Sequence, residues 1–354
     1  MRNLFIMHTQ YNLILSAAVL SKCKDAHNTL VLYSEFALNE DMRAVLSKVF
    51  DRVLVVRDHF CPLPAPLEEI RQIRKDVKKV KCIKNEHFDN IYMSQERIFD
   101  MILCARAKKV NPAAKCYNIE EDAYYSIDEK LNDPNFEYRL TARQKRRRFL
   151  YALLLAGYPY DYKDLHYCYG MSRQYDGVCL QFPALARREL QGKELIEIDA
   201  DQLATGIQSI YSDKKTEVPA TDKYTVFFFD LMNRYKDAEQ VKTTVKQIID
   251  ASKAAGRTVL LKYHPRETDK LPEMDDCFEI SHIIPAEKVL YDLKDTDTVV
   301  MGNATTSCIV AAKLGFRVIS ICKTQFPTNK KIHTAMESMG VFCIEDACNI
   351  NEII

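Results

Sequence analysis

The 354-residue sequence predicts an α/β protein made of two Rossmann-like domains that face each other across a cleft. In both halves, short apolar runs alternate with segments of helical periodicity, as in parallel β-α-β units. A polar, proline-containing stretch at 212–223 separates the halves, and the length suffices for two ordinary domains. We expect a first domain over 1–211, a second over 224–328, and a tail at 329–354 whose helix packs back on the first domain.

The first half alternates regularly up to residue 119. Apolar runs predict strands over 4–7, 29–33, 52–56, 87–93 and 115–119. Helical segments are predicted between them over 11–21, 38–49, 67–84 and 96–109. The alternation weakens between 123 and 213, so the pattern there predicts no regular order of elements.

The second half follows the same pattern more clearly. Strands are predicted over 224–229, 258–263, 277–280, 298–301 and 317–322. Helices are predicted over 237–255, 286–293 and 305–314, with Gly256 and Gly315 ending the first and the last of them. This order is typical of a nucleotide-binding α/β domain.

The composition excludes several classes of protein. Hydrophobic residues make up 47% and charged residues 28%, as in globular proteins, and the net charge of +1 gives no reason to expect a nucleic-acid partner. Twelve cysteines without a CxxC pair indicate buried thiols in a reducing compartment. No signal peptide is evident and no apolar run reaches the length of a membrane span. We therefore expect a cytoplasmic protein.

His264 follows a run that reads as a buried strand, and Pro265 restricts the backbone behind it. In open α/β sheets, ligands bind at the carboxyl ends of the strands. A histidine there can donate to a phosphate as a cation, or protonate it as a general acid near neutral pH. An arbitrary histidine is more often bonded to nearby backbone, but this position favours a site.

A second polar segment opens a helix directly after an apolar strand. It contains Gly302, Asn303, Thr305, Thr306 and Ser307. Hydroxyls and free backbone N–H groups at a helix start suit an anionic oxygen, and they equally suit a simple N-cap. Both interpretations can hold at once, since the glycine lets a ligand approach the backbone closely.

Three adjacent carboxylates, Glu120, Glu121 and Asp122, follow the strand predicted at 115–119. Such a triplet is usually a solvated turn. At a strand end that faces a cleft, repulsion and desolvation raise the pKa of at least one carboxyl toward the range of a general base. The triplet is not a spaced DxD motif and no His/Cys cluster accompanies it, so we predict no metal and no other cofactor.

The basic run 143–148, from Arg143 to Arg148, precedes an apolar stretch. Basic residues beside apolar ones are attracted to an anionic membrane surface, which predicts peripheral contact with the inner membrane face. A buried helix with a charged start fits the run equally well. The sequence is also compatible with a homodimer.

The order of an acidic pair, a His-Pro pair and a hydroxyl pair resembles the bacterial sialyltransferases of glycosyltransferase family 52 and the related bacterial polysialyltransferases. Their two-domain fold is called GT-B. The resemblance spans most of the chain, and the opening residues 4–11 also look like the first strand and loop of these families. Ala123 stands where the families have Gly, and Thr305-Thr306-Ser307 stands in place of a plain Ser pair.

The resemblance implies roles for individual residues. Asp122 would be the general base with Glu121 as its acidic neighbour, and His264 would contact the donor phosphate and act as the acid. The other residues it implies as donor or substrate contacts are Pro265, Glu287, Gly302, Asn303, two of Thr305, Thr306 and Ser307, and the loop residues His8, Thr9 and Gln10.

The implied activity is inverting, metal-independent transfer of sialic acid from CMP-sialic acid to a glycan hydroxyl on lipooligosaccharide or capsule. The partners would be a nucleotide-sugar donor and a glycan acceptor. One alternative is a GT-B transferase or epimerase that uses another nucleotide sugar, such as CMP-Kdo or a UDP-sugar. Another is a non-catalytic nucleotide-sugar-binding scaffold protein.

Overall fold

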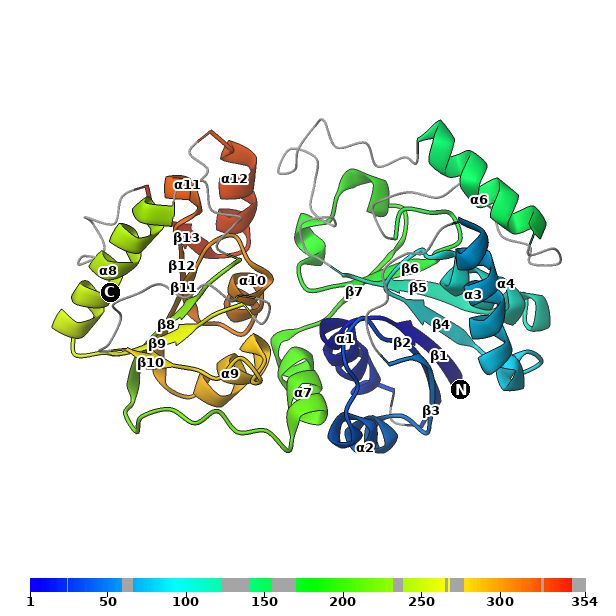
Figure 1. The fold of residues 1–354 in the computed structure, drawn as a ribbon, viewed down its shortest axis with the longest axis horizontal. Helices are drawn as coiled ribbons and strands as arrows, with labels where there is room; N and C mark the ends of the chain where they lie inside the picture. The colour runs from blue at the N-terminus through cyan, green and yellow to red at the C-terminus, as the bar shows by residue number, and fades with distance from the viewer. Residues whose placement is uncertain are drawn as a thin grey trace. The chain divides into compact units, whose positions relative to one another are not determined.

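The computed structural model describes residues 1–23, 25–58, 66–121, 141–154, 170–231, 238–264, 267, 277–325 and 328–345. The chain divides into two compact units, and the division falls between Ile198 and Asp199 (Figure 1). Each unit is an α/β layer structure around its own parallel sheet. The predicted fold class, two Rossmann-like domains, is confirmed at this level.

The first unit contains a seven-stranded parallel sheet in the order β3-β2-β1-β4-β5-β6-β7. The strands are β1 (Arg2–Met7), β2 (His27–Tyr33), β3 (Arg52–Arg57), β4 (Asn90–Met93), β5 (Lys115–Ile119), β6 (Gly177–Leu180) and β7 (Glu194–Glu197). The central strands are buried on both faces, which explains their nearly continuous apolar sequence.

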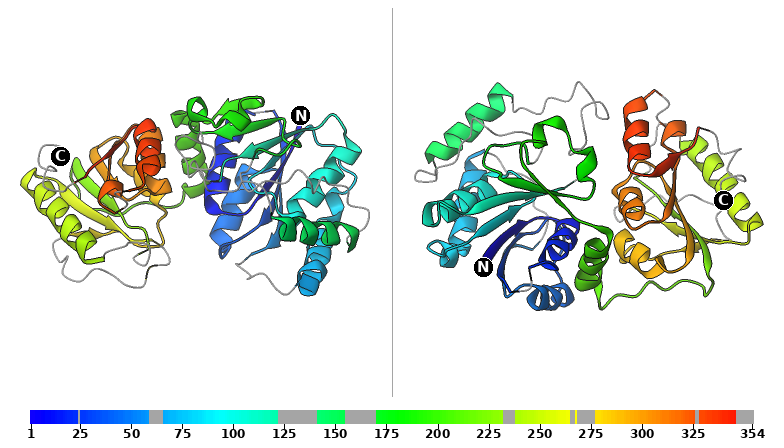
Figure 2. Two further views of the ribbon diagram at one scale, coloured as in Figure 1. Left: turned by 90° about the horizontal axis from the view of Figure 1, so that it is seen from above. Right: turned by 180° about the vertical axis from the view of Figure 1, so that it is seen from behind.

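Helices cover both faces of this sheet (Figure 2). They are α1 (Gln10–Leu20), α2 (Glu40–Val49), α3 (Pro66–Lys79), α4 (Ile98–Val110) and α6 (Ala142–Leu154), with short 3-10 turns at Lys81–Ile83, Pro183–Leu185 and Arg188–Leu190. Ile73 and Val77 of α3 share a core with Leu4 of β1. On the opposite face Phe5 stacks on Tyr92 with ring centroids 4.6 Å apart. Alternate residues of one strand thus pack against different helix layers.

The second unit contains a six-stranded parallel sheet in the order β10-β9-β8-β11-β12-β13. The strands are β8 (Lys223–Phe228), β9 (Thr258–Lys262), β10 (Phe278–Glu279), β11 (Asp297–Gly302), β12 (Arg317–Ser320) and β13 (Val341–Cys343). The helices are α7 (Ala200–Tyr211), α8 (Ala238–Ala254), α9 (Ala286–Leu293), α10 (Thr306–Lys313), α11 (Cys322–Gln325) and α12 (Lys330–Ser338). Helix α8 packs on one face, and α9 and α10 lie on the other (Figure 1).

The structure adds elements to the predicted pattern and shifts its boundaries. The region from 170 to 211 contains β6, β7 and α7, which the sequence pattern did not show. Helix α7 packs against α9 and belongs to the second unit, although the sequence placed it in the first domain and expected the linker at 212–223.

The tail contains the expected helix, α12, and also β13, which pairs with β12 at the edge of the second sheet. Contact of the tail with the first domain stays a prediction.

Cysteines behave as the composition suggested. The nine cysteines in the described part of the chain are free thiols, and six of them are buried. Two pairs lie close together: Cys104 and Cys116 have sulfurs 3.6 Å apart, and Cys322 and Cys343 have sulfurs 3.4 Å apart. Their burial in apolar layers fits small hydrophobic side chains.

Candidate functional site

The carboxyl end of β9 places a cation inside the second unit. Lys262 is the last residue of this strand and is only 3% exposed. The next residue, Tyr263, faces α8 and stacks on Phe229 at a centroid distance of 4.6 Å. Because side chains alternate along a strand, Lys262 points to the opposite layer, which contains α9. Its ammonium donates to the Tyr263 carbonyl at 3.3 Å.

Glu287 lies in that layer and interacts electrostatically with Lys262. It lies in the first turn of α9, which begins after Pro285. Burial raises the pKa of Glu287, while the charge of Lys262 opposes the rise. Burial lowers the pKa of Lys262 to about 8, and the charges of Glu287 and Glu279 oppose this change. The two residues form an ionisable pair whose surroundings disfavour both charges, a property common at functional sites.

His264 lies two residues beyond Lys262, just past the strand end. It is partly buried, and its carbonyl accepts a hydrogen bond from the Glu267 N–H at 2.9 Å. Pro265, the second half of the predicted motif, lies outside the described residues.

The end of β11 and the start of α10 meet where the sequence predicted an anion site. Gly302 is required here for packing, since a Cβ would lie 2.9 Å from the Phe228 carbonyl oxygen and 3.0 Å from the Cys308 sulfur. Packing alone therefore explains a glycine at this position, and its role in the approach of a ligand stays a prediction. Thr305 caps α10 by accepting the Cys308 N–H at 3.4 Å.

Asn303 lies between this glycine and the helix and is 2% exposed. Its side-chain oxygen has no hydrogen-bond partner among the described residues. A buried acceptor without a donor is costly, so this position favours a bound donor group. Thr306 and Ser307 follow in the first turn of α10, where backbone N–H groups lack helical partners. Both residues are partly exposed.

These groups share one edge of one sheet. Strands β9 and β11 flank β8, so His264 and the Thr305 segment stand two strand spacings apart, about 10 Å. That separation suits a ligand that carries a phosphate and extends to a second group. The sequence predicted His264, Glu287 and the Gly302–Ser307 segment separately, and the second unit brings them to the same edge.

In the first unit, the loop after β1 is built around a buried imidazole. His8 is fully buried, and its Nε2 lies 3.0 and 3.1 Å from the two carboxylate oxygens of Asp100. Thr9 caps α1 in a reciprocal bond with Asn12, and Gln10 begins the helix. His8 and Thr9 thus hold the loop in place, and any contact with substrate stays a prediction.

Glu120, the first residue of the acidic triplet, does not lie in a solvated turn. Glu120 is 2% exposed and accepts the Gln181 backbone N–H at 3.1 Å and its side-chain amide at 2.5 Å. Glu121 is partly buried and accepts a hydrogen bond from the Gln95 amide, whose oxygen is bonded to Arg97. Asp122 lies outside the described residues, so its assignment as general base stays a prediction.

Two further properties concern the described residues alone. Within them, no group of three or more His, Cys, Asp or Glu side chains is arranged to hold a metal ion. Metal independence remains a prediction. None of the helices in the described ranges is both long enough and apolar enough to span a bilayer.

No family model matches the sequence, and no curated protein matches it. Solved structures do resemble the fold. A glycosyltransferase of kitacinnamycin aligns over 99% of this chain and 89% of its own, with 10% identity and a TM-score of 0.56. A UDP-GlcNAc 2-epimerase from Methanocaldococcus jannaschii aligns over 96% and 92%, with 13% identity and a TM-score of 0.53. The GT-B domain of a sialyltransferase from Photobacterium damselae aligns over 97% and 98%, with 13% identity and a TM-score of 0.50.

These likenesses establish that the chain has the GT-B fold. At such low identities they bear on fold alone. The fold occurs here in transferases and in an epimerase, so the chemistry has to be argued from the site.

Sequence reasoning missed Lys262, although a signal was present. A single charged residue closes an otherwise apolar strand two positions before His264. A lysine that is buried at the ligand-binding edge of a sheet needs a reason, because burying an ammonium is costly. Gln181 and Asp100 were missed because nothing in their neighbourhood in the sequence reveals their partners.

Proposed function

We propose that the protein is an inverting, metal-independent sialyltransferase, which transfers sialic acid from CMP-sialic acid to a hydroxyl of lipooligosaccharide or capsule. The observation that carries the proposal is the arrangement at the carboxyl edge of the second sheet. There Lys262 and His264 stand at the end of β9, Glu287 lies in the first turn of α9, and α10 begins after β11, two strands away from β9. The sialyltransferase among the structures of the same fold adds support at the level of fold.

The proposed groups divide the reaction between them. The helix start at Thr305, Thr306 and Ser307 holds the phosphate through hydroxyls and backbone N–H groups. Lys262 adds positive charge near that phosphate, and Glu287 contacts the ribose. Charge that develops on the leaving phosphate is stabilised by donors already in place, which requires no metal.

Bond making and breaking follow from the proposed roles. Asp122 takes the proton from the acceptor hydroxyl, whose oxygen attacks the anomeric carbon of sialic acid. The bond between that carbon and the phosphate oxygen breaks through an oxocarbenium-like transition state. CMP departs as His264 donates a proton to its phosphate. One displacement inverts the anomeric centre.

A panel of donors tests the proposal. The protein is incubated with CMP-sialic acid, CMP-Kdo and UDP-GlcNAc, and the released nucleotide is measured by chromatography. We expect CMP from CMP-sialic acid, and a loss of about 10²- to 10⁴-fold in His264→Ala and Asp122→Asn. Release of UDP alone, or unchanged release of CMP in both variants, would reject the assignment.

A second candidate is a transferase or epimerase that uses a UDP-sugar. The observation in its favour is that a UDP-GlcNAc 2-epimerase resembles the chain as closely as the sialyltransferase does. Epimerisation of UDP-GlcNAc without any acceptor, followed by NMR of the sugar ring, distinguishes this candidate.

We also propose that the protein works in the cytoplasm, at the inner face of the membrane. Helix α6 supports this, because Arg143 and Arg146 are exposed next to exposed apolar side chains. Phe149 is 40% exposed and Leu150 is 54% exposed. Basic and apolar groups that are exposed together favour an anionic lipid surface.

A further inference from the structure

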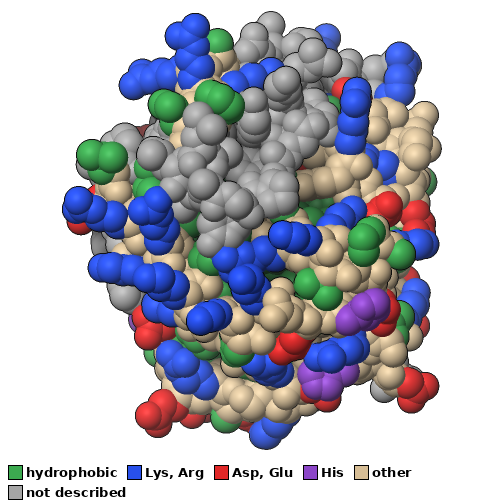
Figure 3. Space-filling view, turned by 90° about the vertical axis from the view of Figure 1, so that its right-hand side faces the viewer, with side chains coloured by type: hydrophobic (Ala, Val, Ile, Leu, Met, Phe, Trp, Pro, Cys, Tyr) green, Lys and Arg blue, Asp and Glu red, His purple; other side chains and the backbone are tan. Residues whose placement is uncertain are grey.

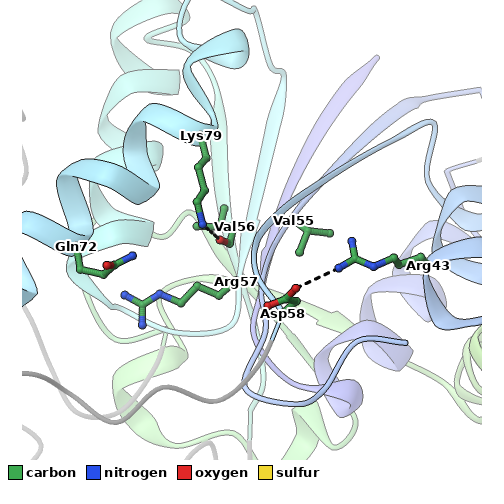
Figure 4. A pocket seen from close by; sticks show the side chains of 7 residues that line it. All are labelled: Arg43, Val55, Val56, Arg57, Asp58, Gln72 and Lys79. Atoms are coloured by element: carbon green, nitrogen blue, oxygen red, sulfur yellow. Dashed lines mark hydrogen bonds and ion pairs between the residues drawn. The ribbon is translucent and has the colours of Figure 1, made fainter. Parts of the chain in front are cut away.

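A hollow of about 400 Å³ opens at the carboxyl end of β3 in the first unit (Figure 4). It is lined by Arg43 from α2, by Gln72 and Lys79 from α3, and by residues 55–58 from the end of β3. The volume lies in the range of small-molecule pockets. Its lining includes no residue of the acidic triplet or of the second unit, so the proposed reaction leaves the hollow unexplained.

The centre of the hollow carries an excess of positive charge. Arg57 donates from Nε and Nη2 to one oxygen of Asp76, at 3.1 and 2.9 Å. Lys79 lies 3.8 Å from the other oxygen of Asp76 and donates to the Val56 carbonyl at 2.5 Å. Asp76 is fully buried, so one carboxylate stands against two cations. The side chain of Lys79 is half exposed, so an anion can reach it from solvent.

The rest of the lining suits a sugar better than a bare phosphate. Val55 is partly buried and supplies an apolar contact against which the C–H face of a sugar ring can pack, whereas Val56 is buried in the core and lines the hollow through its backbone. Gln72 donates its amide to Asp76 at 2.9 Å, which directs its oxygen elsewhere and leaves it to accept from a hydroxyl. Arg43 reaches Asp58 at 3.4 Å, a loose and exposed pair that an incoming carboxylate can replace at low cost.

The hollow lies on the same edge of the sheet as the acidic triplet. The Arg57 guanidinium covers the Tyr33 ring at 4.4 Å, and the same ring lies 5.4 Å from His8. Strand β3 is four strand spacings from β5, roughly 19 Å, in the order of this sheet. A chain of sugars that starts near Glu121 can therefore reach the hollow along a single edge.

The surface beside the hollow is basic as well. Five exposed cations lie on α3, namely Arg71, Arg74, Lys75, Lys78 and Lys79. Residues three and four apart share one side of a helix, so these side chains form a stripe. Figure 3 views the protein from the side of α3, α4 and α6 and shows Lys and Arg side chains spread over it. An acidic chain that approaches this face meets favourable charge before it reaches the hollow.

We propose that this hollow is a distal subsite for an acidic acceptor glycan, which binds a carboxylate-bearing sugar several units away from the reacting hydroxyl. The inference rests on the proposed function for its choice of ligand. The carboxylate would meet Lys79 and Arg43, and the ring would lie against Val55.

Binding of sialyllactose to the full chain, in the absence of any donor, tests the subsite by isothermal titration calorimetry. The variant Arg43→Gln/Lys79→Gln removes two cations from the hollow and leaves the buried Arg57–Asp76 pair intact. The matched control, Lys48→Gln/Lys109→Gln, removes the same charge from exposed positions on α2 and α4. Lactose serves as the neutral ligand and inorganic phosphate as the bare anion.

We expect the hollow variant to bind sialyllactose about fivefold to tenfold more weakly than the parent and the control variant, with a smaller difference at high salt. Equal affinity of both variants, or lactose bound as tightly as sialyllactose, overturns the proposal. Phosphate that displaces sialyllactose at equal concentration also overturns it, because the hollow then recognises charge without a sugar. If sialyllactose binds as expected but the protein does not turn over CMP-sialic acid, the result supports the subsite and rejects the proposed transferase activity.

Discussion

The buried lysine at the end of β9 makes the stability of the second unit depend on pH in a defined direction. Lys262 titrates near pH 8 in the folded chain, against 10.5 as its usual value. Between these two values the unfolded chain binds more protons at this residue than the folded chain does. The contribution of Lys262 to the free energy of unfolding therefore rises with pH across this window.

The magnitude follows from the shift. A change of one pKa unit corresponds to about 1.4 kcal/mol, so the shift sets a ceiling of about 3 kcal/mol. We expect about 2 kcal/mol, because relaxation of the folded chain and water penetration reduce the penalty of a buried charge. Below pH 8 the buried charge lowers the free energy of unfolding of the wild-type chain by this full amount. The variant Lys262→Met has a side chain of similar length without the charge, so its free energy of unfolding is not lowered in this way. The variant should be the more stable protein at pH 7.

The assay compares wild type with Lys262→Met by urea denaturation at pH 7.0, 9.0 and 10.5. Other groups also titrate in this range, but their contributions cancel in the difference between the free energies of unfolding of the two proteins. We expect the advantage of the variant to shrink by about 2 kcal/mol from pH 7.0 to 10.5. Lys223→Met, at the exposed start of β8, should show no such change. A constant difference for Lys262→Met would refute the burial argument.

Three further perturbations probe the packing and the surface. Gly302→Ala places a Cβ 2.9 Å from a backbone oxygen of β8 and should lower the free energy of unfolding by about 1–3 kcal/mol. At Gly192 an added Cβ meets nothing within 4 Å, so Gly192→Ala should lower it far less in the same denaturation assay. Asp100→Asn weakens the buried bond to His8 and should cost about 1–3 kcal/mol; unchanged stability would show that this pair contributes nothing. Leu150→Ser on α6 should reduce cosedimentation with anionic vesicles and leave neutral vesicles unaffected, while equal binding of the variant would exclude this helix as the membrane contact.

The sequence located strand ends better than it located side-chain partners. An apolar strand followed by polar residues marks a carboxyl edge in any parallel sheet, so His264 and Thr305 were found without knowledge of the strand order. Strand β7 was missed because both of its ends are glutamates and its residues are only partly buried or exposed, which leaves little apolar pattern to detect. Residues 200–211, which form α7, were placed in the first domain, since contact with α9 is a tertiary property that the sequence does not show.

The acidic triplet after β5 shows that neighbouring residues in the sequence do not reveal the hydrogen-bond partners of a side chain. Adjacent acidic residues look alike in a sequence, and the solvated turn was the natural expectation for all of them. The structure separates them through a partner sixty-one residues away, Gln181, which fills the hydrogen-bonding capacity of Glu120. Only the pairing of β5 with β6 brings these two residues together.

This separation sharpens the prediction of the general base. Glu120 is buried and bonded twice to Gln181, and Glu121 is bonded to Gln95, so a proton taken up by either carboxylate would disturb an existing bond. We therefore expect Asp122→Asn to lower kcat by about 10²- to 10⁴-fold with little change in KM, and Glu121→Gln to lower it by about tenfold or less. Glu120→Gln should act mainly on stability, because a neutral amide oxygen accepts the two N–H donors of Gln181 more weakly than a carboxylate oxygen does. Steady-state rates with CMP-sialic acid, measured beside urea denaturation of each variant, separate these effects. If Glu121→Gln loses as much kcat as Asp122→Asn while remaining equally stable, the base is Glu121 and the residue-by-residue assignment has to shift by one position.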